Sequence, residues 1–294
     1  MKKEAYFWER IGDGNVQCLL CAHRCRIRKG YFGNCGMRQN IDGTLITYTY
    51  GKIIAANVDP IEKKPLYHFL PGTSSYSIAT PGCNFKCGFC QNWSISQLSK
   101  QEGDDSGYDV SPKEVINDAI MNKCQSISYT YTEPTIFYEY ARDISIVAKE
   151  RGLKNIFVTN GYMTEEVIAD MITFIDAANV DLKSFNDETY RKVCGARLQP
   201  VLDSIVAMKN AGIWVEITTL IVPGMNDTIE ELSSIAGFIK DVNKKIPWHI
   251  SRFHPSYNYG NMPATPLNIL KEAYKIGKGH GLDHVYLGNV PEGS

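Results

Sequence analysis

The sequence predicts an α/β protein: a partial (β/α)6 TIM-like barrel preceded by a small Cys-rich N-terminal domain. Two observations predict this fold. β-Prone and helical segments alternate with short connections from about residue 76 onward, and four cysteines gather before residue 36. Such alternation is typical of right-handed crossovers and a parallel sheet. About six units are too few for a closed eightfold barrel, so we expect an open barrel. We place the domains at residues 1–75 and 76–294.

The first 75 residues differ from the rest in composition. They contain turn glycines and weak helical periodicity, and residues 40–43 (Asn-Ile-Asp-Gly) separate a Cys-rich segment from the β-prone run 44–50. This pattern predicts a hairpin. A domain of this size with little core generally needs a disulfide or metal staple.

From residue 76 the elements can be placed in order. Expected strands are 76–80, 126–131, 154–159, 179–182, 213–220, 248–252 and 283–287. Expected helices begin after Ser111 and at about residues 135, 165, 201, 228 and 267. Ser111, Pro112 and Glu114 form a capping-box pattern, Thr164 is expected to cap the third helix, and Asp227 is expected to cap the fifth.

Composition and charge exclude several classes of protein. Hydrophobic residues make up 44% and charged residues 21% of the 294 residues, and the formal net charge is −1. No strong positive field indicates nucleic acid or an anionic membrane. The first fourteen residues lack an apolar signal core, and no run of about 18 apolar residues occurs. We expect a soluble cytoplasmic protein.

The nine cysteines are unevenly placed. Seven form two tight groups, Cys18, Cys21, Cys25 and Cys35, then Cys83, Cys87 and Cys90. In a reducing cytosol, thiolates at such short spacings bind metals rather than form disulfides. Cys124 and Cys194 stand alone and are expected to be small buried hydrophobic residues.

The second cysteine group has the spacing C-x3-C-x2-C directly after the first barrel strand. An iron–sulfur cluster with four irons needs four thiolates, so three leave one iron open, which suits catalysis. Gly82 and Gly88 permit the turns that such a loop requires. The alternative is a zinc knuckle that borrows a fourth ligand such as His68.

At this loop the sequence resembles the radical S-adenosylmethionine superfamily, and separated motifs agree in order across residues 76–290. The resemblance implies a [4Fe–4S] cluster on Cys83, Cys87 and Cys90 that cleaves S-adenosylmethionine reductively into methionine and a 5′-deoxyadenosyl radical. Residues 59–72 and 78–85 are further similar to the AmmeMemoRadiSam-system enzymes, relatives of pyruvate formate-lyase activating enzyme.

The resemblance also implies the residues that contact S-adenosylmethionine. Residues 131–134 (Tyr-Thr-Glu-Pro) resemble the family's GGEP element, which binds the methionine ammonium, with Tyr131 and Thr132 replacing the glycines. Residues 159–161 resemble its Thr-Asn-Gly turn, and residues 181–183 its Asp-x-Lys element, whose lysine neutralises the carboxylate. Expected contacts are Phe89, Thr132, Glu133, Thr159, Asn160, Asp181, Lys183 and His254.

Several of these residues could instead have a purely structural role. Glu133 would equally suit a helix N-terminus, and Lys183 a surface ion pair. An isolated histidine such as His254 is usually structural. Val158 stands where activating relatives carry an aspartate, which leaves their monovalent-cation site open to question. Residues 222–227 resemble a Pro-Gly-x-Asn-Asp loop of mainly structural value.

The N-terminal cysteines, with spacing C-x2-C-x3-C-x9-C, suit either structural zinc or an auxiliary [4Fe–4S] cluster. His23 could replace one ligand. The need of a small domain for a staple favours zinc. Glu62, Lys63, Lys64 and His68 would line a substrate entrance or form a solvated charge cluster.

The sequence therefore predicts a radical S-adenosylmethionine oxidoreductase that abstracts hydrogen from an unidentified substrate, possibly a protein. Reduced ferredoxin or flavodoxin is the expected electron donor. One alternative is an activase that acts on a glycyl-radical enzyme, which shares the cofactor residues. A metal-stapled electron-transfer or binding protein is an alternative of another class, but it would leave the strand-end motifs without purpose.

Overall fold

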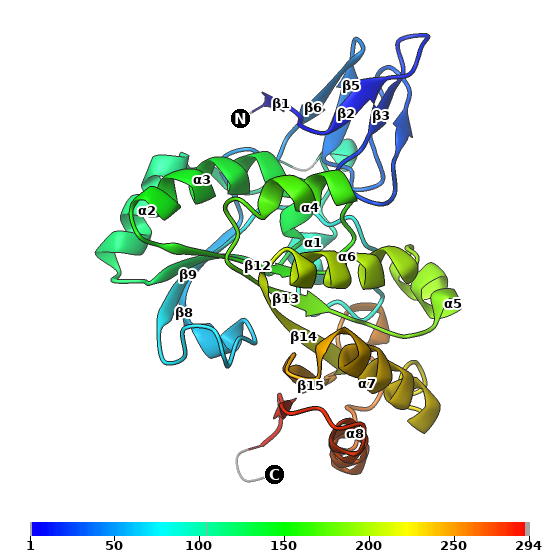
Figure 1. Ribbon diagram of the computed structural model, residues 1–294. Coiled ribbons are helices and arrows are strands. Elements are labelled where there is room, and N and C mark those ends of the chain that lie inside the picture. Colours follow the sequence, from blue (N-terminus) through cyan, green and yellow to red (C-terminus); the bar gives the residue numbers. More distant parts are fainter. Residues whose placement is uncertain (1, 104, 292–294) are drawn as a thin grey trace.

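The computed structural model describes residues 2–103 and 105–291, and its main feature is an eight-stranded sheet (Figure 1). Its strands, in spatial order, are β16 (Val285–Gly288), β15 (Trp248–Arg252), β14 (Trp214–Ile221), β13 (Ala177–Asp181), β12 (Lys154–Thr159), β11 (Ser126–Tyr129), β9 (Ser74–Ala79) and β8 (Ala55–Pro60). Neighbours from β9 to β16 are parallel, and β8 pairs antiparallel with β9. Within the described residues β8 and β16 do not pair, so the predicted open barrel is confirmed.

One long helix follows each parallel strand except the last. These helices are α2 (Pro112–Met121), α3 (Tyr138–Glu150), α4 (Glu165–Met171), α6 (Gln199–Asn210), α7 (Ile229–Asn243) and α8 (Leu267–Gly279). Short helical segments are α1 (Trp93–Ser96), α5 (Asp187–Thr189), η1 (Ile61–Lys63), η2 (Lys100–Glu102), η3 (Pro134–Phe137), η4 (Tyr190–Cys194) and η5 (Tyr257–Tyr259). The expected strands and helices are therefore present, with ends shifted by a few residues.

Helix caps agree with the sequence only in part. In α2 the Ser111 hydroxyl accepts from the Glu114 amide, and the Glu114 carboxylate accepts from the Ser111 amide, which confirms the capping box. Thr164 precedes α4, but its hydroxyl donates to the Leu19 carbonyl instead of capping. The cap of α7 is Thr228, which accepts from the Glu231 amide, so the prediction that Asp227 caps this helix is wrong.

The N-terminal segment forms small antiparallel sheets at the top of Figure 1. Their strands are β1 (Lys3–Glu4), β2 (Trp8–Arg10), β3 (Val16–Cys18), β4 (Arg26–Ile27), β5 (Arg38–Ile41) and β6 (Thr44–Thr47), while β7 (Lys52–Ile53) pairs with β10 (Tyr108–Asp109). The predicted hairpin is confirmed: Asp42 and Gly43, both with positive φ, connect β5 to β6. The domain boundary after residue 75 stays a prediction. β8 precedes this boundary in the sequence but pairs with β9 of the large sheet.

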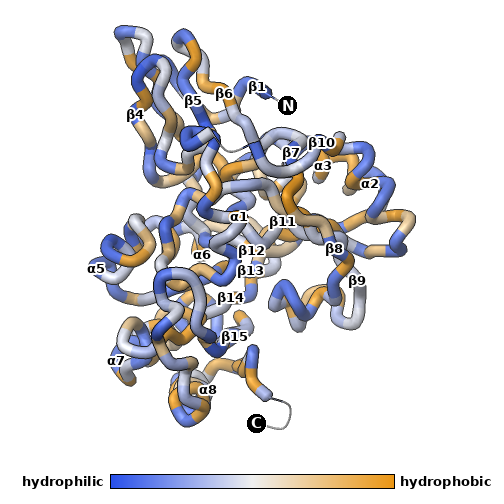
Figure 2. The backbone as a smooth tube through the Cα atoms, turned by 180° about the vertical axis from the view of Figure 1, so that it is seen from behind, coloured by the Kyte–Doolittle hydropathy of each residue, from blue (hydrophilic) through white to orange (hydrophobic). Residues whose placement is uncertain are grey.

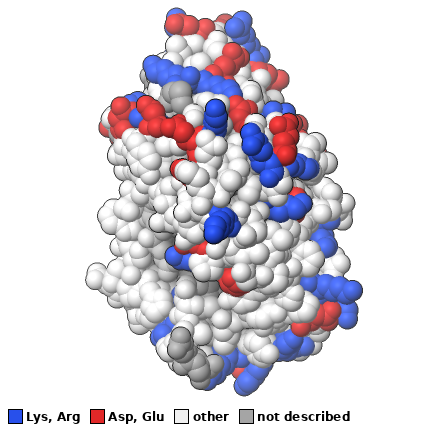
Figure 3. Space-filling view, turned by 90° about the vertical axis from the view of Figure 1, so that its left-hand side faces the viewer, with Lys and Arg blue, Asp and Glu red and all other residues white. Residues whose placement is uncertain are grey.

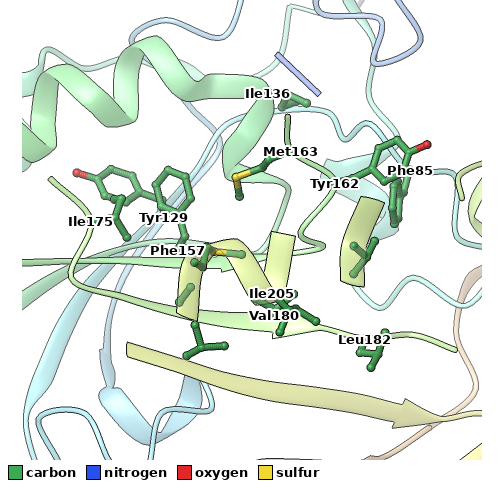
Figure 4. Packing of buried hydrophobic residues seen from close by; sticks show 14 of the residues in the cluster. Phe85, Tyr129, Ile136, Phe157, Tyr162, Met163, Ile175, Val180, Leu182 and Ile205 are labelled. Carbon is green, nitrogen blue, oxygen red and sulfur yellow. The ribbon is translucent and has the colours of Figure 1, made fainter. Parts of the chain in front are cut away.

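A shared hydrophobic core joins the N-terminal segment to the barrel. Val16 and Leu20 belong to the same buried cluster as Phe85, Tyr129 and Met163, and Figure 4 shows the packing of the last three. Hydrophobic stretches lie in the interior of the fold and hydrophilic ones at the outer turns (Figure 2). Burial of this apolar surface holds the two parts together.

The surface agrees with the near-neutral charge of the sequence. On the face in Figure 3, acidic and basic side chains intermingle toward the upper end, and the middle is largely uncharged. This face therefore carries no continuous band of side chains with the same charge. Among the described residues, no helix is both long and apolar enough to cross a bilayer.

Candidate active site

The cysteine loop of residues 80–90 begins where β9 ends, at the carboxyl edge of the parallel sheet. Gly82 starts the loop with φ +94°, and a Cβ at this position would lie 2.8 Å from Met37 Cγ and 3.2 Å from Ile136 Cδ1. A side chain here would force Met37 to move, and a φ of +94° is strained for residues other than glycine, so this position favours glycine. Gly88 is similarly close to the Tyr259 ring, 2.9 Å from its would-be Cβ.

The three thiols of the loop have hydrogen-bond partners of different kinds. Cys83 Sγ accepts from the Phe85 amide at 3.4 Å, and Cys90 Sγ lies 3.2 Å from Ser96 Oγ. Burial, followed by the Glu133 carboxylate, raises the pKa of Cys83, and burial raises the pKa of Cys90. The partner of Cys87 is another thiol.

Cys194 is that partner. It ends the π-helical segment η4, is buried as expected for a lone cysteine, and accepts the Lys86 amide hydrogen bond through its carbonyl. The hydrogen bond to Cys194, together with burial, raises the pKa of Cys87. Cys124 is also buried, so both predictions of small buried cysteines are confirmed.

The three thiols of the loop do not form a site for a single metal ion. Among the described residues, no three histidine, cysteine, aspartate or glutamate side chains converge closely enough to hold one metal ion. His68 does not complete a zinc knuckle, because its Nε2 is 2.7 Å from the Tyr286 hydroxyl and its amide donates to Glu216. Three thiols spread along one loop remain suitable for three corners of an iron–sulfur cluster.

Glu133 joins the ends of β11 and β12. Its Oε1 accepts from the Thr135 amide and hydroxyl and from Thr159 Oγ1, and its Oε2 accepts from the Asn160 amide at 2.8 Å. Burial raises the pKa of Glu133, although these hydrogen bonds oppose the shift. The carboxylate also serves as the cap of η3, as the alternative reading of Glu133 anticipated. The predicted residues Glu133, Thr159 and Asn160 therefore lie together.

Asn84 connects this network to the cysteine loop, and the sequence analysis missed it. Its Oδ1 accepts from Asn160 Nδ2 at 2.8 Å, and its carbonyl lies 2.9 Å from His23 Nε2. Its Nδ2 is buried and has no hydrogen-bond partner. The position of Asn84 between two cysteines of the loop was the one signal that could have identified it.

Asp181 and Lys183 follow β13 and form an ion pair with an N–O distance of 2.9 Å. The Lys183 ammonium also lies 5.9 Å from the centre of the Phe89 ring, and the Lys183 side chain is only 15% exposed. Although burial disfavours its charge, the Asp181 carboxylate holds the pKa of Lys183 well above its ordinary value. The structure thus brings Lys183 to the cysteine loop, and in this ion pair the lysine is more shielded than Asp181, whose side chain is 37% exposed.

His254 is not brought to the loop by any contact within the described residues. Its exposed ring lies 3.3 Å from the Asn289 carbonyl. The segment just after it does reach the cysteines: Ser256 Oγ donates to the Cys90 carbonyl, and the Asn258 amide donates to the Gly88 carbonyl. Tyr259 packs on Phe89 with ring centres 6.1 Å apart. These contacts were also missed.

Tyr131 replaces the family's glycine at a strained position. Its φ is +63°, and the Thr132 amide donates to the Thr130 carbonyl across it, which closes a three-residue turn. Thr132 Oγ1 donates to the Thr80 carbonyl at the start of the cysteine loop. The Tyr131 phenol donates to Asp59 on β8 and contributes its ring to a contact with the Lys64 ammonium.

Lys64 and Asp59 form a buried ion pair beneath this turn. Both side chains are at most 5% exposed, and Lys63 adds a second, more exposed contact to Asp59. Lys64 is therefore not part of a solvated charge cluster. Burial alone would raise the pKa of Asp59, but hydrogen bonds from Lys64, Tyr131 and Lys63 hold it below its ordinary value.

Three comparisons with known proteins relate to this geometry. The family described as the Radical SAM superfamily matches residues 77–239. The uncharacterized protein MJ0808 of Methanocaldococcus jannaschii is 45% identical over 291 residues, which covers 98% of this chain and 86% of the relative. The putative glycyl-radical enzyme activating enzyme MJ1227 of the same organism is 28% identical and covers 75% of this chain and 91% of its own length.

A solved structure shares the fold. A domain of pyruvate-formate lyase-activating enzyme from Bacteroides vulgatus superposes with a TM-score of 0.50 at 16% identity, over 56% of this chain and 99% of that domain.

Proposed function

Since the chain belongs to the radical SAM superfamily, we propose that it cleaves S-adenosylmethionine reductively at a [4Fe–4S] cluster ligated by Cys83, Cys87 and Cys90. When bound, the cluster supplies one electron that breaks the C5′–S bond, giving methionine and a 5′-deoxyadenosyl radical that takes hydrogen from a substrate. Reduced ferredoxin or flavodoxin would deliver that electron.

One observation carries the proposal: three buried or half-buried thiols lie on a single loop at the carboxyl edge of the sheet, where ligands bind in open α/β folds. The donor set suits the cluster, because thiolates are its usual ligands and the Phe85 amide is already directed at Cys83 Sγ. The family implies both the cluster and the cofactor.

The surrounding residues would bind and orient S-adenosylmethionine. Lys183 is a half-buried cation beside Phe89 and is suited to pair with the methionine carboxylate. Glu133 and Asn160 would hold the strand ends that face the cofactor, and Thr132 would fix the loop by its bond to Thr80. Glu133 already accepts four hydrogen bonds, so it would meet the methionine ammonium only by sharing them.

The proposal is tested with protein reconstituted anaerobically with iron and sulfide and reduced with dithionite. We expect wild-type protein to convert S-adenosylmethionine into 5′-deoxyadenosine, as measured by chromatography, and Cys83→Ala to give no product above background. Cys124→Ala is the matched control, because this buried cysteine lies outside the loop, and it should keep the activity. Equal product from Cys83→Ala and wild type would reject the proposed function.

A second candidate function is activation of a glycyl-radical enzyme by hydrogen abstraction from a glycine of a partner protein. The similarity to MJ1227 favours it. Incubation with deuterated candidate substrates distinguishes the two functions. Deuterium that enters 5′-deoxyadenosine from a glycine-labelled protein, together with a glycyl-radical spectrum, supports activation, whereas transfer from a small molecule supports the first function.

A further inference from the structure

The four N-terminal cysteines surround one cavity, which the proposed function does not use. It is lined by Cys18, Cys21, Cys25 and Cys35 together with His23 and Arg38. Cys18 ends β3, and Cys21 forms an isolated β-bridge with Met163 of the barrel. None of the four forms a disulfide. All four cysteines therefore line the same small cavity.

A backbone amide is directed at one of these sulfurs. The Asn34 amide donates to Cys25 Sγ at 3.4 Å, although burial still raises the pKa of Cys25. Hydrogen bonds of this kind favour the thiolate over the thiol. The catalytic loop has the same feature in the contact from Phe85 to Cys83.

Arg38 supplies a second, independent observation. Its side chain is 2% exposed, and its terminal nitrogens bind the Glu139 carboxylate and the Tyr6 carbonyl. Its Nε is buried and has no hydrogen-bond partner. A buried N–H without an acceptor is costly, so a cation that lines a cavity of four sulfurs indicates an anionic occupant.

The position of the cavity favours a cluster over zinc. The family implies an iron–sulfur cluster at the catalytic loop, and the N-terminal cavity adjoins that loop, because His23 Nε2 lies 2.9 Å from the Asn84 carbonyl. A redox-active centre would make use of that position, whereas a structural zinc ion would not.

We propose that Cys18, Cys21, Cys25 and Cys35 ligate an auxiliary [4Fe–4S] cluster, and that Arg38 compensates its negative charge and donates Nε–H to it. His23 is not needed as a ligand, since its Nε2 lies 2.9 Å from the Asn84 carbonyl. The centre adjoins the catalytic loop. Tyr162, between the two, packs on His23 and Phe85 with ring centres 4.8 and 5.2 Å apart, and Figure 4 shows it beside Phe85.

Metal content of a protein without the catalytic cluster tests the assignment independently of the proposed function. The variant Cys83→Ser/Cys87→Ser/Cys90→Ser is reconstituted anaerobically with iron, sulfide and one equivalent of zinc, then analysed for metals and sulfide. We expect about four iron and four sulfide per chain, with an electron paramagnetic resonance signal after reduction. Bound zinc without iron, or no bound metal, overturns the proposal.

The role of Arg38 is tested by the reduction potential of the same variant. To this variant we add the double substitution Arg38→Gln/Glu139→Gln. It removes both members of the buried ion pair, so neither charge is left without its partner. We expect a lower potential, because Arg38 lines the cavity and Glu139 is not among its lining residues, so the double substitution mainly removes a positive charge beside the cluster. Arg142→Gln, at a half-exposed ion pair elsewhere, is the matched control. An unchanged potential in Arg38→Gln/Glu139→Gln would remove Arg38 from the assignment.

Discussion

Cys194 is a residue on which the three-ligand proposal depends. It is buried, and its thiol acts on Cys87 by raising the pKa of that residue, although the two cysteines are far apart in the sequence. A fourth thiolate on the cluster would leave no iron open for S-adenosylmethionine. A buried cysteine that only packs against its neighbours has no such effect.

We predict that Cys194→Ala keeps the iron and sulfide of the catalytic cluster. The expected reason is that Cys83, Cys87 and Cys90 suffice as ligands, and only a small buried volume is lost. Iron analysis after reconstitution checks this, with Cys87→Ala as the variant that should lose iron. Equal iron loss in both variants would mark Cys194 as a fourth ligand.

For Lys183 we predict weaker cofactor binding. Lys183→Ala should raise the dissociation constant of S-adenosylmethionine by the equivalent of about 1–3 kcal/mol, because the half-buried cation proposed to pair with the cofactor carboxylate would be lost. Equilibrium binding to the reconstituted protein measures it. Lys154→Ala removes a more exposed pair with Asp176 and serves as control. Unchanged affinity in Lys183→Ala would leave the lysine a structural partner of Asp181.

Single residues were predictable where their role is encoded locally. Cysteine spacing and the strand-end motifs 131–134, 159–161 and 181–183 can be read in the sequence because each spans a few neighbouring positions. Asn84, Asp59 and Tyr259 were missed, since their importance comes from contacts with distant segments. Nothing in the local pattern distinguishes an asparagine that bridges two loops from one that faces solvent.

At the scale of elements, the helix starts show how similar patterns acquire different roles. Both Ser111 and Thr164 precede acidic first turns, yet only Ser111 accepts an amide hydrogen bond. Thr164 instead donates to Leu19, which the sequence places far away. Tertiary contacts thus decide which hydroxyl caps a helix.

Ser111→Ala should therefore lower the free energy of unfolding by about 1 kcal/mol, since the first turn of α2 loses a capping bond. Urea denaturation followed by circular dichroism measures the change. Ser234→Ala, inside α7 and bonded only to the Glu230 carbonyl, should change it by less than about 0.5 kcal/mol. Equal losses in the two variants would contradict a specific capping role.

Regular elements were predictable and irregular ones were not. Long helices carry apolar periodicity and breakers, so α2, α7 and α8 were expected close to their observed bounds. β8 was missed, because Ala55–Pro60 lacks clear alternation and ends in proline. It forms a strand because it pairs along the whole of β9, which no local pattern reveals.

At the scale of the whole molecule, the carboxylate of Asp59 joins the edge strand of the sheet to the candidate site. Asp59 of β8 binds Lys64 from the next connection and Tyr131 from the end of β11. Removal of one buried charge leaves its partner uncompensated, which typically costs about 3–5 kcal/mol. Loss of either charge should therefore destabilise both the edge strand β8 and the turn at Tyr131.

We predict that Asp59 makes the free energy of unfolding depend on pH. The pKa of Asp59 in the folded chain lies below its ordinary value of 3.8, so its contribution is complete above roughly pH 5 and is lost as the pH falls below 4. Unfolding free energies of wild type and Asp59→Asn/Lys64→Met, measured by urea denaturation, should converge as the pH falls. A difference that stays constant from pH 7 to pH 3.5 would contradict this.

The clasp formed by Ser256, Asn258 and Tyr259 on the cysteine loop has a consequence for the order of biosynthesis. The loop leaves the ribosome early, but the segment that holds it is made only after residue 250. Until then the Cys90 and Gly88 carbonyls lack these partners. The full surroundings for iron loading therefore exist only once the chain has been translated beyond Tyr259.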